Sequence, residues 1–521
     1  MRIIDFFDKA AAATPERSLI ISDAGEVSYQ AAAEHSVALG QGLCARGLQA
    51  GDRVGVLAPN VAEGFLAMLA LWRADGAWVP LNFRNTVQAS IDFMNEVGCS
   101  WLLLHSSFAD AAELIREEVP TLREIICLDR DFAGAAPLAD VIKAGAGLPL
   151  ADRGDPYGNP DDLCCAWPTG GTTGKSKAVA WTGQVWATLI ETATRHWPGN
   201  EHVMNLMVAP ITHAAGVMAV IFASRGGTVV IRPGFDADDA LAQIEAHRIT
   251  HLFLPPTAYY DLLTRQREQP RDTSSLQMIL LSAAPVSPDR FAQGVEVFGP
   301  CLAQSWGQAE SPFVLTYLTP EVVAAAAAGD HPERLGSCGR STFSSRVAAM
   351  DPAGNILPAG ERGELVARGR LVTPGYLNKP EETARVREHG WHHTGDVGYL
   401  DADGYVYVVD RMKDMIITGG FNVYPAEVEA ALLALPEVAE CTVIGVPDER
   451  WGEAVCAVIV PAVPGWQDEP LVTAHAKKVL GSVKAPKLVL FRDGLPRTAV
   501  GKIDKKLVRA DFWRGEDRAV H

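Results

Sequence analysis

The amino-acid sequence predicts an α/β protein, with a large N-terminal domain of α/β subdomains whose sheets are mostly parallel and a small C-terminal α+β domain. Three observations support this prediction. The chain has 521 residues, more than one compact core usually holds. Helical patterns alternate with short β-branched runs through the first half. Near residue 395 the pattern changes to hairpin-like segments.

The alternation of helix and strand is clearest in the first 100 residues. Helices are expected at residues 29–47 and 61–75, and strands with turns at residues 52–60 and 76–82. The same order recurs farther on, where a helical pattern at residues 240–250 leads into the strand-like HLFLPP. Such alternation indicates βαβ units, and ligands of these sheets bind in the loops beyond the carboxyl ends of the strands.

The C-terminal part shows shorter elements. Residues 398–411 (GYLDADGYVYVVDR) predict a hairpin with a D-G turn at Asp403 and Gly404. A helix is expected at residues 425–435 and a strand at residues 441–446. We therefore expect a large domain over residues 1–410 and a small domain over residues 411–521.

Composition is that of an ordinary globular protein, with 48% hydrophobic and 21% charged residues. The N-terminal stretch MRIIDFFDKA carries Arg2, Asp5, Asp8 and Lys9, which a signal-peptide core would not contain. The longest weakly polar run, residues 214–224, is far shorter than a membrane span. We therefore expect a cytoplasmic protein that is not integral to a membrane.

Charge and cysteine usage exclude two classes of function. A formal net charge of −17 argues against general nucleic-acid binding, because phosphate neutralisation needs a basic face. The nine cysteines show neither C-x-x-C pairs nor histidine spacing suited to zinc, and are expected to be reduced core residues. Residues 477–509 carry ten basic side chains against two acidic ones, which fits either a solvated surface or a site for a phosphorylated small molecule. The sequence does not indicate the oligomeric state.

A glycine-rich loop is the first candidate site. Residues 168–179 read PTGGTTGKSKAV, but a Walker loop requires glycine where Thr169 stands, and the following AVAWT favours a strand over a helix. The glycines still permit close backbone approach to an anion, and the threonines and lysines offer donors and charge. A phosphate-binding loop of another kind is the favoured interpretation, with an ordinary flexible loop as the alternative.

Several stretches together resemble the adenylate-forming enzymes, the superfamily of acyl-CoA and aryl-CoA synthetases, luciferases and adenylation domains. They occur in the family's order along nearly the whole chain: PTGGTTGKSKAV (168–179), PITHAAG (210–216), SWGQAESP (305–312), residues 393–429 from HTGDVGYL to YPAEVE, GVPDERWGEAV (445–455) and LPRTAVGKI (495–503). The resemblance implies an ATP-dependent carboxylate:CoA ligase. A carboxylate attacks the α-phosphate of ATP to give an acyl-adenylate and pyrophosphate, and the thiol of coenzyme A then displaces AMP.

The resemblance also assigns the nucleotide site. Glu310 in GQAE corresponds to the residue associated with Mg²⁺, for which a carboxylate oxygen is a suitable ligand. Gly170, Ser176, Trp306 and Ala309 stand where the family usually has Ser, Pro, Tyr and Thr. The residues expected to contact ATP are Thr169, Gly170, Gly171, Thr172, Thr173, Gly174, Lys177, Ala284, Trp306, Gly307, Asp396 and Arg411.

Further roles follow from the same resemblance. Lys502 in TAVGKI corresponds to the catalytic lysine that bridges the carboxylate and the α-phosphate. The small domain is expected to rotate after adenylation about a hinge at Lys413. This rotation would present a second face to coenzyme A. The residues expected on that face are Gly419, Gly420, Phe421 and Trp451.

The acid is less well defined by the sequence. His213 resembles the family's gate to the acyl pocket, and the alanines around it favour an apolar acid, fatty or aromatic. A stand-alone ligase that loads an acyl carrier protein would share every ATP residue and stays open as the alternative. A luciferase-like oxygenase would share the adenylation half. A non-catalytic nucleotide-binding regulator is disfavoured because Lys502 and Glu310 are both present.

Overall fold

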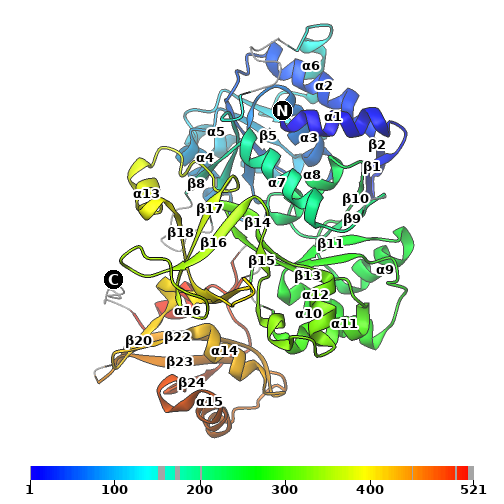
Figure 1. Ribbon diagram of the computed structural model, residues 1–521. Helices are drawn as coiled ribbons and strands as arrows, with labels where there is room; N and C mark the ends of the chain where they lie inside the picture. The colour runs from blue at the N-terminus through cyan, green and yellow to red at the C-terminus, as the bar shows by residue number, and fades with distance from the viewer. Residues whose placement is uncertain are drawn as a thin grey trace. The chain divides into compact units, whose positions relative to one another are not determined.

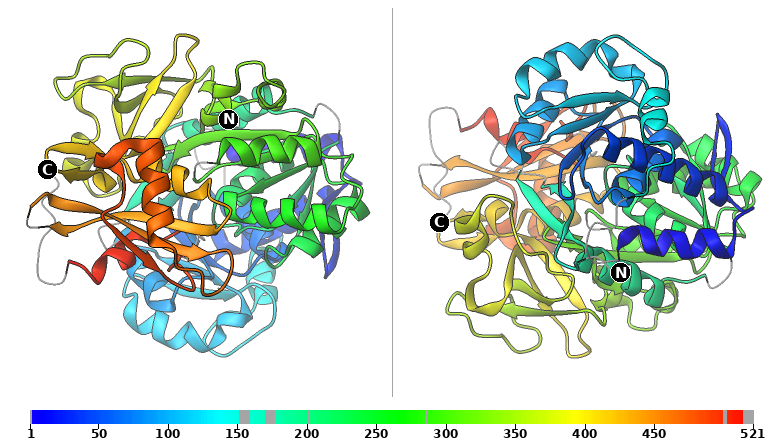
Figure 2. Two further views of the ribbon diagram at one scale, coloured as in Figure 1. Left: turned by 90° about the horizontal axis from the view of Figure 1, so that it is seen from below. Right: turned by 90° about the horizontal axis from the view of Figure 1, so that it is seen from above.

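The structure, a computed structural model, describes residues 2–150, 159–169, 177–199, 202–284, 286–448, 450–498 and 502–513. The chain forms two compact units, whose ribbons are drawn in Figures 1 and 2. The first comprises Met1–Arg346 and Ala367–His392, and the second Val347–Val366 and His393–His521. The second unit thus includes strands that precede residue 411, because these strands pair mainly with one another. The division at residues 410 and 411 remains a prediction about which parts move.

The larger sheet of the first unit has nine strands within the described residues, in the order β15-β14-β13-β12-β11-β9-β10-β1-β2. Its strands are β1 (Ser18–Ser22), β2 (Gly25–Ser28), β9 (Met204–Met207), β10 (Thr228–Ile231), β11 (His251–Leu254), β12 (Met278–Leu281), β13 (Leu302–Gln308), β14 (Ser311–Leu318) and β15 (Arg340–Ser341). The neighbours from β13 through β1 pair in parallel, and β14, β15 and β2 are antiparallel to their neighbours.

A second sheet of this unit has six strands in the described part of the chain, in the order β6-β5-β3-β4-β7-β8. They are β3 (Arg53–Leu57), β4 (Ala77–Leu81), β5 (Trp101–Leu104), β6 (Glu124–Cys127), β7 (Leu163–Pro168) and β8 (Ala178–Thr182). Only the β7–β8 pair is antiparallel among the pairs described. Every residue of β4 and of β5 is buried, as expected of parallel strands that are covered on both faces.

Helices cover both faces of the larger sheet. Figure 1 shows α9 to α12 gathered on one side of it, and α7 and α8 on the other. The helices of the first unit are α1 (Ile3–Ala13), α2 (Tyr29–Ala45), α3 (Ala62–Arg73), α4 (Val87–Val97), α5 (Ala112–Glu118), α6 (Leu138–Gly145), α7 (Gly183–His196), α8 (Ala214–Ala223), α9 (Ala237–His247), α10 (Pro256–Glu268), α11 (Pro288–Phe298), α12 (Pro320–Ala327) and α13 (Pro380–Arg385), with 3₁₀ turns η1 (Ser106–Ala111), η2 (Pro332–Gly336) and η3 (Glu388–Gly390).

The second unit contains two sheets. One is β16 (Ser345–Met350), β17 (Gly363–Gly369), β18 (His392–Leu400) and β19 (Val406–Arg411), in that order, and is followed by the 3₁₀ turn η4 (Met412–Asp414). The other contains β20 (Ile416–Thr418), β21 (Phe421–Val423), β22 (Val438–Asp448), β23 (Gly452–Pro461) and β24 (Leu488–Phe491), with helices α14 (Pro425–Leu433), α15 (Glu469–Lys484) and α16 (Lys505–Ala510). The long β22–β23 hairpin forms the centre of this second sheet.

The predicted α/β fold is confirmed, element by element, where the sequence pattern was strong. The helical pattern of residues 29–47 is α2, and the apolar pattern of residues 61–75 is the almost wholly buried α3. The predicted hairpin at residues 398–411 is the antiparallel β18–β19 pair, and its turn glycine Gly404 has φ of 82°. The strand expected after the glycine-rich loop is β8. No helix in the described parts of the chain combines the length and apolar character needed to cross a bilayer.

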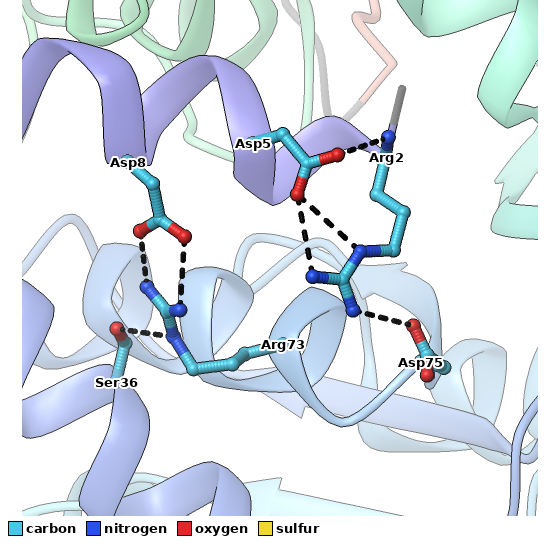
Figure 3. A network of polar contacts seen from close by, with 6 residues as sticks. All are labelled: Arg2, Asp5, Asp8, Ser36, Arg73 and Asp75. Carbon is cyan, nitrogen blue, oxygen red and sulfur yellow. Dashed lines mark hydrogen bonds and ion pairs between the residues drawn. The ribbon is translucent and has the colours of Figure 1, made fainter. Parts of the chain in front are cut away.

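A guanidinium at the end of α3 holds the N-terminal helix against its neighbours (Figure 3). Arg73 donates to both carboxylate oxygens of Asp8 in α1, at 3.0 and 2.5 Å, and to the hydroxyl of Ser36 in α2 at 3.0 Å. Beside it, Arg2 pairs with Asp5 and Asp75. The side chain of Arg73 is 10% exposed and that of Asp8 39%, so this fork is partly shielded from water and salt.

We expect Arg73→Leu to lower the free energy of unfolding by roughly 1–3 kcal/mol, because three charge-assisted donors are lost at once. Arg248→Leu is the matched control: its guanidinium is 64% exposed and pairs with the exposed Asp272, so its removal should cost less than about 1 kcal/mol. Urea denaturation followed by tryptophan fluorescence measures both variants. If both variants lose the same free energy of unfolding, the hydrogen bonds of Arg73 stabilise the protein no more than an exposed ion pair does.

Candidate active site

The two ends of the glycine-rich loop meet in the first unit. The amide of Thr169 donates to the carbonyl of Lys177 at 2.8 Å, and the amide of Lys177 donates to the hydroxyl of Thr169 at 3.1 Å. These bonds extend the β7–β8 ladder and close the base of the loop. The other predicted loop residues, Gly170, Gly171, Thr172, Thr173 and Gly174, lie outside the described residues.

The remaining predicted residues of this unit lie at one edge of the larger sheet. Because β9, β12 and β13 are parallel, their carboxyl ends share that edge. His213 begins the helix after β9, and Ala284 follows β12. Trp306 and Gly307 lie near the carboxyl end of β13, a few residues before Glu310. These residues therefore lie at the carboxyl ends of the parallel strands, and their contacts with a ligand stay a prediction.

Two backbone positions at this edge are unusually constrained. Ala283 has φ of 77°, a left-handed conformation that costs an alanine roughly 1–2 kcal/mol. A Cβ on Gly307 would lie 2.6 Å from the amide nitrogen of Phe313 on β14. Only glycine fits there, so the bulged β13–β14 turn that presents Glu310 depends on it.

Glu310 has two partners from a distant segment. Its side-chain Oε1 accepts a hydrogen bond of 2.6 Å from the hydroxyl of Tyr376, and its carbonyl accepts one of 2.9 Å from the amide of Thr373. Within the described residues, no hydrogen bond engages Oε2. The indole of Trp181 on β8 donates to the carbonyl of Ala309 at 2.7 Å, which ties the strand after the loop to the turn that carries Glu310.

Glu310 suits the metal that the family implies. The described residues contain no group of three or more His, Cys, Asp or Glu side chains suited to hold a metal ion. Mg²⁺ does not require such a cage, because it usually keeps several waters and binds one or two carboxylates together with substrate phosphates. A single carboxylate with one oxygen left open fits that pattern.

His213 is half-buried among polar and aromatic neighbours. Its Nδ1 lies 2.6 Å from the carbonyl of Thr212, and its Nε2 lies 3.4 Å from the side-chain amide of Asn82. The ring centroid is 6.4 Å from that of Trp167, which stacks on Trp181 at 4.2 Å. The predicted gate residue thus lies between polar groups and the Trp167 indole, which is itself stacked on Trp181.

Asp396 and Arg411 are cross-strand partners in the second unit. They face each other in the β18–β19 register, and Nε of Arg411 lies 2.5 Å from Oδ1 of Asp396. The carboxylate side chain is 3% exposed and the guanidinium side chain 45%. The ion pair orients a buried acceptor next to an accessible donor.

Lys502 and Lys413 belong to the same electrostatic group. Lys502 is exposed as a residue, yet protein atoms crowded around its ammonium, with repulsion by Arg411 and Lys413, lower its pKa to about 8 against the attraction of Asp396. Desolvation and repulsion by Arg411 also lower the pKa of Lys413. Lys413 is the middle residue of η4, directly after β19. The structure thus brings four predicted site residues of the second unit into one set of interacting charges.

The residues predicted to contact coenzyme A also come together. Gly419 and Gly420 form a left-handed turn between β20 and β21, with φ of 56° and 81°. The amide of Gly419 donates to the carbonyl of Trp451 at 2.8 Å, and the indole lies over Gly419 so closely that a Cβ would be 2.6 Å from it. Phe421 and Trp451 are 58% and 38% exposed, and the guanidinium of Arg450 lies 4.8 Å from the centre of the Trp451 ring.

Sequence reasoning missed Tyr376, Trp181 and Glu382. Tyr376 bonds to Glu310 across a separation of 66 residues, and Glu382 forms an ion pair with Lys177. A single tyrosine after glycine carries no distinguishing pattern, and Glu382 lies in an ordinary acidic first turn of α13. Only the fold brings these side chains to the predicted residues.

Two family models match the chain: AMP-binding enzyme over residues 7–377 and AMP-binding enzyme C-terminal domain over residues 427–502. The chain is 40% identical to a medium/long-chain-fatty-acid–CoA ligase, FadD8 of Mycobacterium tuberculosis, over 82% of this chain and 75% of that protein. It is 34% identical to a feruloyl-CoA synthase of an Amycolatopsis species, over 97% and 98% of the two chains.

Among solved structures, the amide bond synthetase McbA from Marinactinospora thermotolerans superimposes with a TM-score of 0.87 at 29% identity, covering 98% of this chain and 100% of that one. The matches extend over both units and include the segments that carry Glu310 and Lys502. The chain belongs to the family of AMP-binding, adenylate-forming enzymes and is an AMP-forming acid–thiol ligase of the acyl-CoA synthetase type.

Proposed function

We propose that this ligase activates a fatty or aromatic carboxylic acid with ATP and transfers the acyl group to coenzyme A. In the first step a carboxylate oxygen bonds to the α-phosphorus and the bond to pyrophosphate breaks. In the second step the thiol sulfur bonds to the acyl carbon and AMP leaves. The acid has a pKa near 4 and is already ionised at neutral pH, so the first step needs no general base. ATP and coenzyme A abound in the cytoplasm, where we expect the enzyme to work.

The observation that carries the proposal is the Asp396–Arg411 ion pair together with the electrostatic coupling of both residues to Lys502. The buried Asp396 carboxylate is suited to accept hydrogen bonds from ribose hydroxyls, and Arg411 offers donors next to it. A cation coupled to this pair would lie near the α-phosphate of the same nucleotide. There it offsets the repulsion between the carboxylate and the triphosphate, which is the main obstacle to the first step.

The other predicted residues have complementary roles in the proposal. Thr169, Lys177 and the loop between them hold the pyrophosphate that leaves, while Ala284, Trp306 and Gly307 border the nucleotide. Mg²⁺, when bound by Glu310 and the phosphates, supplies positive charge that stabilises the departing pyrophosphate. His213 borders the acyl group. Rotation of the small domain about Lys413 would withdraw Lys502 and present Gly419, Gly420, Phe421 and Trp451 to the thiol substrate.

A panel of acids tests the proposal. Purified enzyme with ATP, Mg²⁺ and coenzyme A should release AMP with fatty or aryl acids and form the matching thioester. Release of ADP, or no release of AMP with any acid, would contradict the proposal. A thioester that appears on a phosphopantetheinyl carrier protein but not on free coenzyme A would favour the carrier-loading alternative.

The coenzyme A face makes a separate prediction. Gly419→Ala adds a methyl group where the Trp451 ring lies 2.6 Å away, so the indole must shift. We expect the KM for coenzyme A to rise about tenfold, with ATP–pyrophosphate exchange within about twofold of wild type. Gly404→Ala is the control: its φ of 82° imposes similar backbone strain, but a Cβ would meet no heavy atom within 4 Å. Equal changes in the two variants would contradict a role for this face.

A further inference from the structure

Tyr376 connects two of the residues proposed to hold the phosphates and the metal. Its hydroxyl donates to Oε1 of Glu310 at 2.6 Å, and the ammonium of Lys177 lies 5.0 Å from the centre of its ring. Lys177 also forms an ion pair with Glu382. One side chain therefore contacts both the carboxylate suited to Mg²⁺ and the lysine at the end of the phosphate loop.

The backbone of Tyr376 is fixed on several sides. The amide of Ala180 donates to the carbonyl of Gly375, and the amide of Leu377 donates to the carbonyl of Ala178, so this segment pairs with β8. The amide of Tyr376 donates to the hydroxyl of Thr383 at 3.0 Å. Gly375 has φ of 134°, and a Cβ there would lie 2.3 Å from the Thr383 side chain. The ring therefore has little freedom to leave its position.

The phenol is a permanent donor. A phenol has an ordinary pKa near 10 and is protonated at neutral pH, and the hydroxyl of Tyr376 lies 2.6 Å from Oε1 of Glu310. It can only donate to the carboxylate, and it does so on Oε1. The carboxylate is thus held in one orientation, with Oε2 directed elsewhere.

We propose that Tyr376 is a positioning residue for ATP and Mg²⁺ binding. It holds the Glu310 carboxylate in the orientation that receives the metal, and its ring attracts the ammonium of Lys177 and so keeps that side chain in place. This inference rests on the proposed role of Glu310. Without the hydroxyl, the carboxylate rotates freely and must be ordered when the metal binds, so affinity is lost. Removal of the hydroxyl alone, with the ring retained, isolates this effect.

Tyr376→Phe should weaken binding of ATP in the presence of Mg²⁺ about tenfold, the usual effect of losing a hydrogen bond to a charged group. Binding of ATP in EDTA should stay within about twofold of wild type, because the metal is absent. Isothermal titration calorimetry measures both. The Mg²⁺ concentration that half-saturates ATP–pyrophosphate exchange should rise by a similar factor. Tyr259→Phe is the control, since it removes another buried phenol whose hydroxyl donates to the carbonyl of Arg290 at 2.7 Å.

Two further variants separate the possible failures. Glu310→Gln should show the same loss of Mg²⁺-dependent binding, and the double variant should bind no worse than Glu310→Gln alone. Additive losses, or unchanged Mg²⁺ dependence in Tyr376→Phe, would overturn the inference. Unchanged Mg²⁺ dependence in Glu310→Gln would overturn the metal role of Glu310 and the inference with it. If no acid supports AMP release while the calorimetric pattern holds, the proposed function fails and the role of Tyr376 in nucleotide binding stands.

Discussion

Lys502→Ala is expected to reduce carboxylate-dependent ATP–pyrophosphate exchange by roughly 100- to 1,000-fold, the range found when one electrostatic stabiliser is removed from an active site. Thioester formation from supplied acyl-adenylate should stay within about threefold of wild type, because that step no longer brings two anions together. Lys506→Ala is the matched control. It removes an exposed lysine of the same basic segment, four residues away, and should change neither step. Exchange that persists in Lys502→Ala would contradict the role assigned to this lysine.

The same role predicts a pH dependence. The folded pKa of Lys502 is lowered to about 8, so the residue is a cation below that pH and becomes neutral above it. Only the cation can offset the repulsion between the reacting anions, so exchange should fall as pH rises through about 8. The acid substrate is ionised throughout this range and does not contribute. The residual exchange of Lys502→Arg should lack this fall, because a guanidinium stays charged.

Lys413→Pro is expected to impair the thioester step at least about tenfold while adenylation stays within about threefold. Proline fixes φ near −65° and disfavours the helical conformation at the preceding residue, so η4 loses the freedom that a pivot needs. Lys413→Ala removes the charge but leaves the backbone free, and should affect the two steps equally. Single-turnover measurements of acyl-adenylate and thioester formation compare the steps. Equal loss of both in the proline variant would contradict a hinge at this position.

The fold could be predicted well because its signals are local. The apolar patterns of α3, β3 and β4 encode burial on all sides. The glycine-rich loop could be distinguished from a Walker loop because β-favouring residues follow it, and β8 is the result. Burial and strand formation are here indicated by residues that lie close together in the sequence, so one sequence is enough to predict them.

The basic segment shows where composition alone reaches its limit. Its charges fitted either a solvated surface or a phosphate site, and half of its ten basic residues form ion pairs within the second unit. These pairs are Lys484–Glu427, Arg492–Asp511, Arg497–Glu440, Lys505–Glu429 and Arg509–Asp414. Their acidic partners come from as far away as β22 and η4, and no pattern in the segment itself indicates them. Only the family resemblance distinguished Lys502 from its neighbours.

The partners of Glu310 could not be predicted for a similar reason. Its assignment came from the GQAE motif, but the hydroxyl that orients its carboxylate belongs to Tyr376, 66 residues farther along. The functional side chains of a motif lie within a few residues of one another. The side chains that orient them come from distant segments, which only the tertiary structure brings close. The left-handed backbone of Ala283 was equally invisible, since an alanine gives no signal of positive φ.

The central claim is that the acid is activated as an acyl-adenylate. An acid labelled with ¹⁸O in its carboxylate tests it most directly, with ATP, Mg²⁺ and coenzyme A present. Attack of a carboxylate oxygen on the α-phosphorus transfers that oxygen to AMP when the thiol displaces it. We therefore predict one labelled oxygen in each AMP and none in pyrophosphate. Label in inorganic phosphate, accompanied by ADP, would show an acyl phosphate instead and would contradict the account.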